Sequence, residues 1–189
     1  MSTNIQEEKK IRNLSLDSLS ERHPGLTRAV GDGYAEAAAV CLSRHHEPPT
    51  TVFVDVDEKA SECRADWHVP DDRTLRAWAN EIDTTEAGAY GLTLAAVELE
   101  HGLVAVRRAE TLTGADYYIA PAGSDASDFE ACIRLEVSGT DRGDEKVIEQ
   151  RLKSKLKQAA AGASNLPAIA SVVGFRARAI VMAKLGDAQ

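Results

Sequence analysis

The sequence has few cysteines and no long apolar run. None of its stretches approaches the roughly 18 apolar residues that a membrane-spanning helix needs, so we expect no membrane partner. The opening residues, MSTNIQEEKK, lack the apolar core of a signal peptide, which favours a cytoplasmic protein. The three cysteines, Cys41, Cys63 and Cys132, are odd in number and show no metal-binding spacing. We therefore expect buried, reduced thiols rather than disulfides or a zinc site.

The chain also lacks several enzyme motifs and an overall positive charge. It contains no GxSxG, HExxH or Walker sequence, which argues against the serine hydrolases, zinc proteases and P-loop nucleotide hydrolases that use them. Its net charge is −8, whereas a free-standing DNA-binding protein derives most of its affinity from basic residues that contact phosphates. Basic residues nevertheless cluster in the C-terminal third, at Arg142, Lys146, Arg151, Lys153, Lys155, Lys157, Arg176, Arg178 and Lys184.

What the chain does contain is enough for one globular domain. Its 189 residues, 43% of them hydrophobic, can bury a sizeable core. The polar residues 1–25 predict an N-terminal arm, for which partial disorder is more typical than docking onto a partner. The globular domain is then expected over residues 26–189.

The first part of that domain, residues 26–83, predicts a helix, a β-hairpin and a short helix. Apolar residues recur at helical spacing over residues 26–45, and they alternate with polar residues over 50–69. Asp71 and Asp72 then precede a short helical pattern, where acidic side chains favour a helix N-terminus.

The second part, residues 84–189, predicts a helix, three strands, a second helix and a final apolar segment. That segment, residues 166–185, is typical of one or two strands, although its periodicity also fits a buried helix. We therefore expect an α+β fold of α/β-like character, with a mixed central sheet flanked by helices.

Two carboxylates in this second part suggest a site. Asp116 stands at the start of one predicted strand, and Glu136 lies inside the next. Two carboxylates aimed at one spot from neighbouring strands can hold a divalent metal ion, and such an ion is a common tool for phosphodiester cleavage.

The order helix, three strands, helix, strand, with Asp116 and Glu136 at these places, resembles the core of the PD-(D/E)xK nuclease superfamily over roughly the last hundred residues. GAD at 114–116 stands where the family has Pro-Asp, and LEVS at 135–138 stands where it has x-Glu-x-Lys. Ser138 therefore replaces the motif lysine. The resemblance implies a restriction-endonuclease-like core, capped by the N-terminal helix and hairpin.

The same resemblance implies a metal site. Mg²⁺ or Mn²⁺ would be held by Asp116, Glu136 and the carbonyl of Val137. Glu98, or otherwise Glu100, matches the acidic residue that many members carry on the first core helix, and would add a metal ligand.

The resemblance also implies a catalytic set of Asp116, Glu136 and Ser138, with Gln150 and Arg151 where some members place helper residues. Ser138 donates a hydrogen bond but carries no positive charge. Arg142 or Lys146, or a second metal ion, would have to compensate; otherwise activity is lost while the fold is retained.

Two classes of function stay open at this point. One is a metal-dependent DNA hydrolase or a catalytically degenerate nuclease-fold subunit, with DNA as partner if active, within a defence or DNA-processing complex. The other is a non-enzymatic interaction subunit of a multiprotein assembly that binds a protein partner or a second copy of the chain. The metal-dependent hydrolase requires the carboxylates of Asp116 and Glu136 to lie within about 5 Å of a common point. An alternation of Arg134, Glu136 and Ser138 is equally typical of a half-exposed sheet face.

Overall fold

A computed structural model of the chain describes residues 11–110, 113–124, 128–162 and 164–185. Within these ranges the chain forms one eight-stranded mixed sheet and five α-helices. The strands are β1 (Arg12–Leu14), β2 (Thr50–Val56), β3 (Lys59–Ala65), β4 (Leu103–Arg108), β5 (Tyr117–Pro121), β6 (Ile133–Thr140), β7 (Ala168–Gly174) and β8 (Ala179–Lys184). The helices are α1 (Leu19–Arg22), α2 (Arg28–Ser43), α3 (Asp72–Ala77), α4 (Glu81–His101) and α5 (Glu145–Ala161), with a 3-10 turn at Phe129–Ala131.

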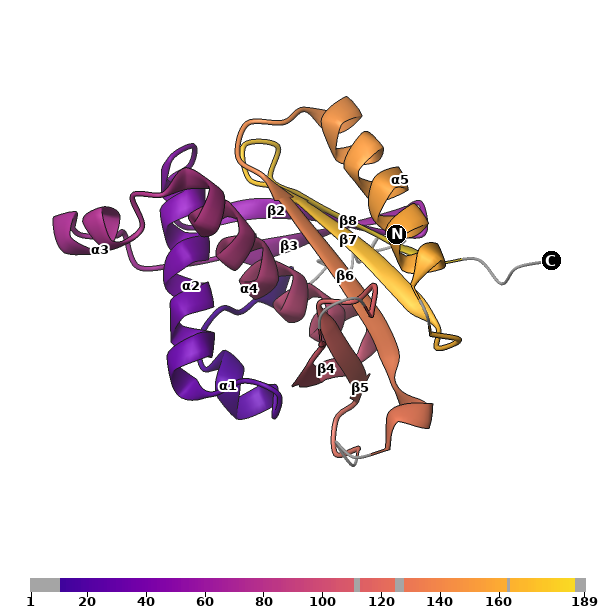
Figure 1. The fold of residues 1–189 in the computed structure, drawn as a ribbon. Helices are drawn as coiled ribbons and strands as arrows, with labels where there is room; N and C mark the ends of the chain where they lie inside the picture. The colour runs from indigo at the N-terminus through magenta and orange to yellow at the C-terminus, as the bar shows by residue number, and fades with distance from the viewer. Residues whose placement is uncertain (1–10, 111–112, 125–127, 163, 186–189) are drawn as a thin grey trace, which may run out of the picture.

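The sheet has the spatial order β1-β3-β2-β8-β7-β6-β5-β4. Helices α1, α2 and α4 lie on one face, and α5 covers the middle of the other (Figure 1). This confirms the expected mixed α/β architecture with helices on both sides of a central sheet. The final apolar segment forms two antiparallel strands, β7 and β8, and not a buried helix. In the part of the chain that the structure describes, none of the helices has the length and apolar character needed to cross a membrane.

Residues 12–25 belong to this folded body, which corrects the expectation of a free arm over residues 1–25. Strand β1 pairs in parallel with β3 at the edge of the sheet. Leu14, Leu16 and Leu19 are each under 5% exposed and join the main core. Arg12 also forms an ion pair of 2.6 Å with Glu100 of α4. Only residues 1–10 of the expected arm lie outside the described residues.

Helices α2 and α4 pack closely because small residues face each other at their contact. A Cβ atom at Gly91 would lie 2.9 Å from the carbonyl oxygen of Tyr34, and one at Gly88 would lie 3.0 Å from the backbone of Ala38. The first distance is too short for a Cβ unless the backbone shifts, and the second is tighter than most Cβ contacts, so the two glycines permit the close separation of the helices. This contact holds the N-terminal half of α4 in place against the sheet.

Strand β6 lies between α4 and α5. Its antiparallel partner is β5, and its parallel partner is β7, to which it is joined through α5. On one face Gly139 touches α4, since a Cβ there would lie 2.7 Å from the carbonyl oxygen of Thr85. On the other face Glu136 and Ser138 contact side chains of α5. The end of β6 is therefore where α4, α5 and the sheet meet.

The close packing of α2 and α4 predicts opposite effects for the same substitution at two helical glycines. Gly91→Ala should destabilise the protein by about 1–3 kcal/mol, because the new Cβ would overlap the backbone of α2. Gly33→Ala should stabilise it by up to about 1 kcal/mol, because alanine favours a helix. The nearest atom to a Cβ at Gly33 is 3.9 Å away, on Trp78. Urea denaturation of the two variants measures both effects, and a change of the same sign in both would contradict this packing.

Candidate functional site

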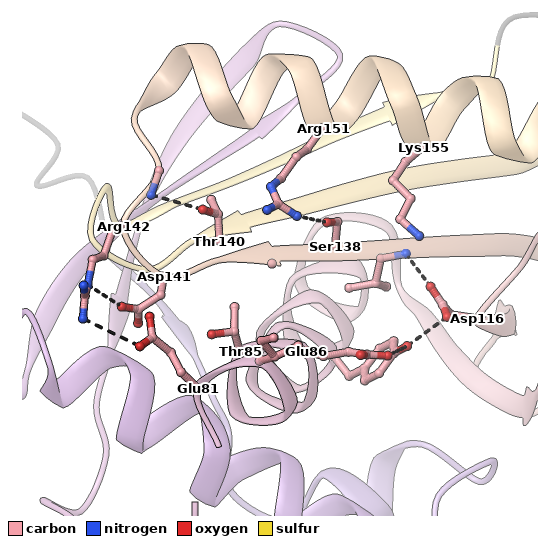
Figure 2. Close-up of a pocket in the computed structure, with 15 residues that line it drawn as sticks. Glu81, Thr85, Glu86, Asp116, Ser138, Thr140, Asp141, Arg142, Arg151 and Lys155 are labelled. Atoms are coloured by element: carbon pink, nitrogen blue, oxygen red, sulfur yellow. Dashed lines mark hydrogen bonds and ion pairs between the residues drawn. The ribbon is translucent and has the colours of Figure 1, made fainter. Parts of the chain in front are cut away.

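A cavity of about 620 Å³ opens where α4, β6 and α5 meet. Glu81 and Arg142 lie at one end of it, Asp116 lies at the other, and Arg151 and Lys155 reach down from α5 along its wall (Figure 2). Its full lining comprises Glu81, Ile82, Thr85, Glu86, Tyr90, Asp116, Val137, Ser138, Gly139, Thr140, Asp141, Arg142, Gly143, Arg151 and Lys155. The cavity thus combines carboxylates from α4 and the sheet with cations from α5 and from the loop after β6.

Asp116 is fixed at the edge of β6 by backbone and side-chain hydrogen bonds. It directly precedes β5, and its backbone N–H donates to the carbonyl of Leu135 at 2.8 Å. Its Oδ2 accepts a hydrogen bond of 2.8 Å from the N–H of Val137, and its Oδ1 accepts one of 2.9 Å from the hydroxyl of Tyr90. Arg108 lies 3.7 Å from the same carboxylate. Asp116 is therefore held in one orientation at the cavity wall.

Tyr90 connects this carboxylate to α4. Burial, together with the negative charge of Asp116, raises the pKa of the Tyr90 phenol, so the hydroxyl keeps its proton and acts as a donor. The same hydroxyl lies 3.0 Å from Glu86, but its one proton serves one carboxylate at a time. Arg108 donates to the hydroxyl at 3.0 Å and lies over the ring at 4.4 Å. Asp116 thus sits in a partly buried network of aromatic and polar groups at the wall of the cavity.

Glu136 lies on the α5 side of β6 and is sealed from solvent. Its side chain is 3% exposed, and its Oε2 accepts a hydrogen bond of 2.8 Å from the ammonium of Lys155. Gln158 adds a long contact of 3.5 Å to the other oxygen. Burial raises the pKa of Glu136; the charge of Asp116 raises it further, and Lys155 partly offsets this. The two carboxylates therefore interact electrostatically, although each is held by different partners and only Asp116 lines the cavity.

The side chains of β6 and α5 meet in register. Alternate residues of a strand are about 6.6 Å apart, and every fourth residue of a helix is about 6 Å apart, so the two spacings nearly match. Three successive contacts result: Ser138 with Arg151 at 3.3 Å, Glu136 with Lys155 at 2.8 Å, and Arg134 with the carbonyl of Ala159 at 2.9 Å. The register therefore places Arg151 and Lys155 of α5 beside Ser138 and Glu136 of β6, where Ser138 itself carries no charge.

The structure does not bring Glu98 to Asp116 and Glu136. Glu98 lies near the other end of α4, about 18 Å along the axis from Glu86 at 1.5 Å per residue. There it forms an ion pair of 2.8 Å with Arg22. Its alternative, Glu100, is paired with Arg12, so neither lines the cavity. The acidic residues of α4 that do line it are Glu81 and Glu86.

The basic residues suggested to compensate for Ser138 have different surroundings. Arg142 lines the cavity, but at the end opposite Asp116, where it lies 3.7 Å from Glu81 and 3.4 Å from Asp141. Lys146 and Gln150 are not part of the lining, whereas Arg151 is.

Lys155 was not singled out from the sequence, although a signal for it exists. The helix between two parallel strands packs on the sheet with residues four apart facing the same row of strand side chains. Arg151 and Lys155 have this spacing, opposite the row of Ser138 and Glu136. A search for cations at such positions would have identified Lys155.

The donors at this site suit a metal ion only in part. Among the described residues, no three His, Cys, Asp or Glu side chains gather closely enough to hold a metal ion. Asp116 and Glu136 supply two carboxylates, and Mg²⁺ is commonly bound by one or two carboxylates with water and substrate phosphate as its other ligands. Because only Asp116 of the two lines the cavity and Glu136 is paired with Lys155, the described side chains would hold such an ion only together with a bound phosphate and not alone.

Comparisons of the chain with protein-family models, with curated proteins and with solved structures gave no match.

The raised pKa of Glu136 predicts how stability depends on pH. The folded state holds this proton more tightly than the unfolded state, so ionisation of Glu136 removes stability as the pH rises from near its ordinary value of 4.5 through the higher folded value. Glu136→Gln removes this loss, and the unfolding free energy of the variant should therefore rise relative to wild type as the pH rises above about 4.5. Urea denaturation at three pH values measures the trend. Glu149→Gln, at an exposed position of α5, controls for the change in charge, and a trend of opposite sign would mean that Lys155 dominates.

Proposed function

We propose that this protein is a metal-dependent phosphodiester hydrolase that acts on DNA, with a PD-(D/E)xK-like core. One observation carries the proposal: the ammonium of Lys155 lies 2.8 Å from Glu136, beside Asp116 and above an open cavity. Lys155 would supply, from α5, the positive charge that Ser138 does not supply from β6.

The connectivity of the chain around the cavity supports this proposal. Helix α4 is followed by β4, β5 and β6, which pair antiparallel in that order, and α5 then leads to β7 in parallel with β6. The superfamily core has the same succession of helix, three strands, helix and strand. Asp116 precedes the second of these strands, and Glu136 lies in the third, where that core has its acidic residues.

The chemistry proposed divides the work between a metal ion and the protein. A bound Mg²⁺ or Mn²⁺ would polarise the scissile phosphate and lower the pKa of the attacking water. Asp116 and Glu136 would hold the ion, and Tyr90 would keep Asp116 oriented towards it. Arg151, whose guanidinium contacts Ser138 at the cavity wall, would bind a phosphate oxygen.

Binding of an ion and a phosphate would rearrange the Lys155–Glu136 pair. Glu136 would turn an oxygen to the cation, and Lys155 would direct its ammonium to the phosphate. After the exchange each of the two side chains would still have a charged partner, because the ion would replace Lys155 at Glu136 and the phosphate would replace Glu136 at Lys155. The burial of Glu136 makes a cation at this position necessary in both states. Negative charge that develops on the phosphate would then meet Lys155 and Arg151.

Incubation of the purified protein with supercoiled, linear and single-stranded DNA tests the proposal. We expect cleavage that depends on Mg²⁺ or Mn²⁺ and stops when EDTA is added. Asp116→Asn and Lys155→Met should each lower the rate by about 10²–10³-fold, because each removes a charge that acts on the reacting phosphate. Lys153→Met, which removes an exposed lysine from the same helix, is the matched control and should keep the wild-type rate.

Two outcomes would overturn the proposal. Cleavage that persists unchanged in Asp116→Asn and Lys155→Met would show that the activity resides elsewhere. Failure of the folded wild-type protein to cleave any of the three DNA forms, with its fold verified by urea denaturation, would remove the hydrolase function.

A further inference from the structure

A second groove, of about 440 Å³, lies between α2 and the connection that leads from β3 to α3. It shares no lining residue with the Asp116 cavity. Its floor is apolar: Leu16 and Ala39 are buried, and Ala35 and Trp67 are partly buried. The volume lies within the range of about 300–1,000 Å³ that is typical of ligand clefts.

Two tryptophans hold this connection against α2. The indole N–H of Trp67 donates to Ser43 at 2.8 Å, and that of Trp78 donates to Glu36 at 3.0 Å. Between them, α3 buries none of its side chains. The segment from Trp67 to Trp78 is therefore attached to α2 at its two ends, and the part between them forms the outer wall of the groove.

Apolar side chains on this wall are left in solvent. Val69, which lines the groove, is 65% exposed, and Leu75 of α3 is 44% exposed. Burial of such side chains is favourable, so a partner that covers them would gain affinity.

The rim of the groove is negatively charged. Five carboxylates belong to its lining, at Asp17, Asp32, Glu36, Asp66 and Asp71, and the lining contains no lysine or arginine. Arg28 and Arg64 lie at the margin, where they pair with Asp32 at 3.4 Å and Asp66 at 3.2 Å. Both arginines are themselves largely exposed, so these pairs are weak and a ligand can replace them. The rim thus keeps an excess of negative charge around an apolar floor.

We infer that this groove binds a basic peptide segment of a partner protein, with one apolar side chain packed on the floor that Leu16, Ala35, Ala39 and Trp67 form. The carboxylates of the rim complement lysine or arginine side chains of the segment, and the floor receives the apolar side chain between them. The same charges repel nucleic acid and anionic membrane surfaces, which excludes these as occupants. This site does not depend on the hydrolase proposal.

Fluorescence polarisation with labelled peptides tests the inference. The probe is a short peptide with one central leucine flanked by lysines. One comparison peptide has serine for leucine, and another has glutamate for lysine. We expect the lysine–leucine peptide to bind, the serine peptide to bind more weakly, and the glutamate peptide not to bind.

Charge-matched double variants separate the groove from general attraction to an acidic protein. Asp32→Asn with Glu36→Gln should weaken binding of the lysine–leucine peptide by about threefold or more, since each exposed charge contributes modestly. The glutamine that Glu36→Gln introduces can still accept the hydrogen bond of Trp78 through its side-chain oxygen. Glu47→Gln with Glu149→Gln removes the same charge from exposed positions elsewhere and should leave binding unchanged.

Three results would overturn the inference. Equal weakening in the two double variants would reduce the effect to net charge. Equal binding of the leucine and serine peptides would mean that the apolar floor is not used. Self-association in sedimentation velocity that is lost in the Asp32→Asn, Glu36→Gln variant would make a second copy of the chain the occupant.

Discussion

The packing of β6 between two helices determines where every group of the candidate site lies. On one face, Gly139 allows α4 to approach so closely that no side chain fits between them. On the other face, the row of Glu136 and Ser138 meets α5 in register. Along the same strand edge, the N–H of Val137 donates to the Asp116 carboxylate and the carbonyl of Leu135 accepts from its N–H, which sets the position of Asp116 relative to both helices. A shift of β6 by one residue would move each of these groups to the opposite face, which is why the site depends on this register.

The electrostatics of the site follow from burial of a negative charge. Glu136 is removed from water, and a buried carboxylate is costly unless a cation accompanies it. Lys155 meets this requirement, while the nearby charge of Asp116 works against ionisation of Glu136. The result is a buried carboxylate, Glu136, paired with Lys155, while Asp116 and Lys155 line the wall of an open cavity. In the proposed chemistry, a divalent cation would take the place of Lys155 beside Glu136, and a phosphate would take the place of Glu136 beside Lys155.

The two proposed binding surfaces differ in their balance of charge and share one support. Helix α4 lines the Asp116 cavity, and α2, packed against α4 through Gly88 and Gly91, provides a wall of the acidic groove. Cations from α5 face the cavity, whereas carboxylates form the rim of the groove. The cavity therefore mixes charges of both signs, whereas the lining of the groove contains carboxylates and no lysine or arginine. An anionic substrate at one surface and a cationic segment at the other would not compete.

The sequence by itself determined the elements and the faces of β6, because hydrophobic periodicity is a local property that a helix or strand carries wherever it packs. It did not reveal that residues 12–25 fold onto the sheet, since three leucines in a polar stretch are too few to show a period. It also placed the acidic residue of the first core helix at Glu98, or otherwise Glu100, and did not single out Lys155. Which end of α4 reaches β6, and which face of α5 covers it, depend on the strand order and on a helical crossover between parallel strands. These are contacts between residues far apart in the chain, and only the tertiary structure decides them.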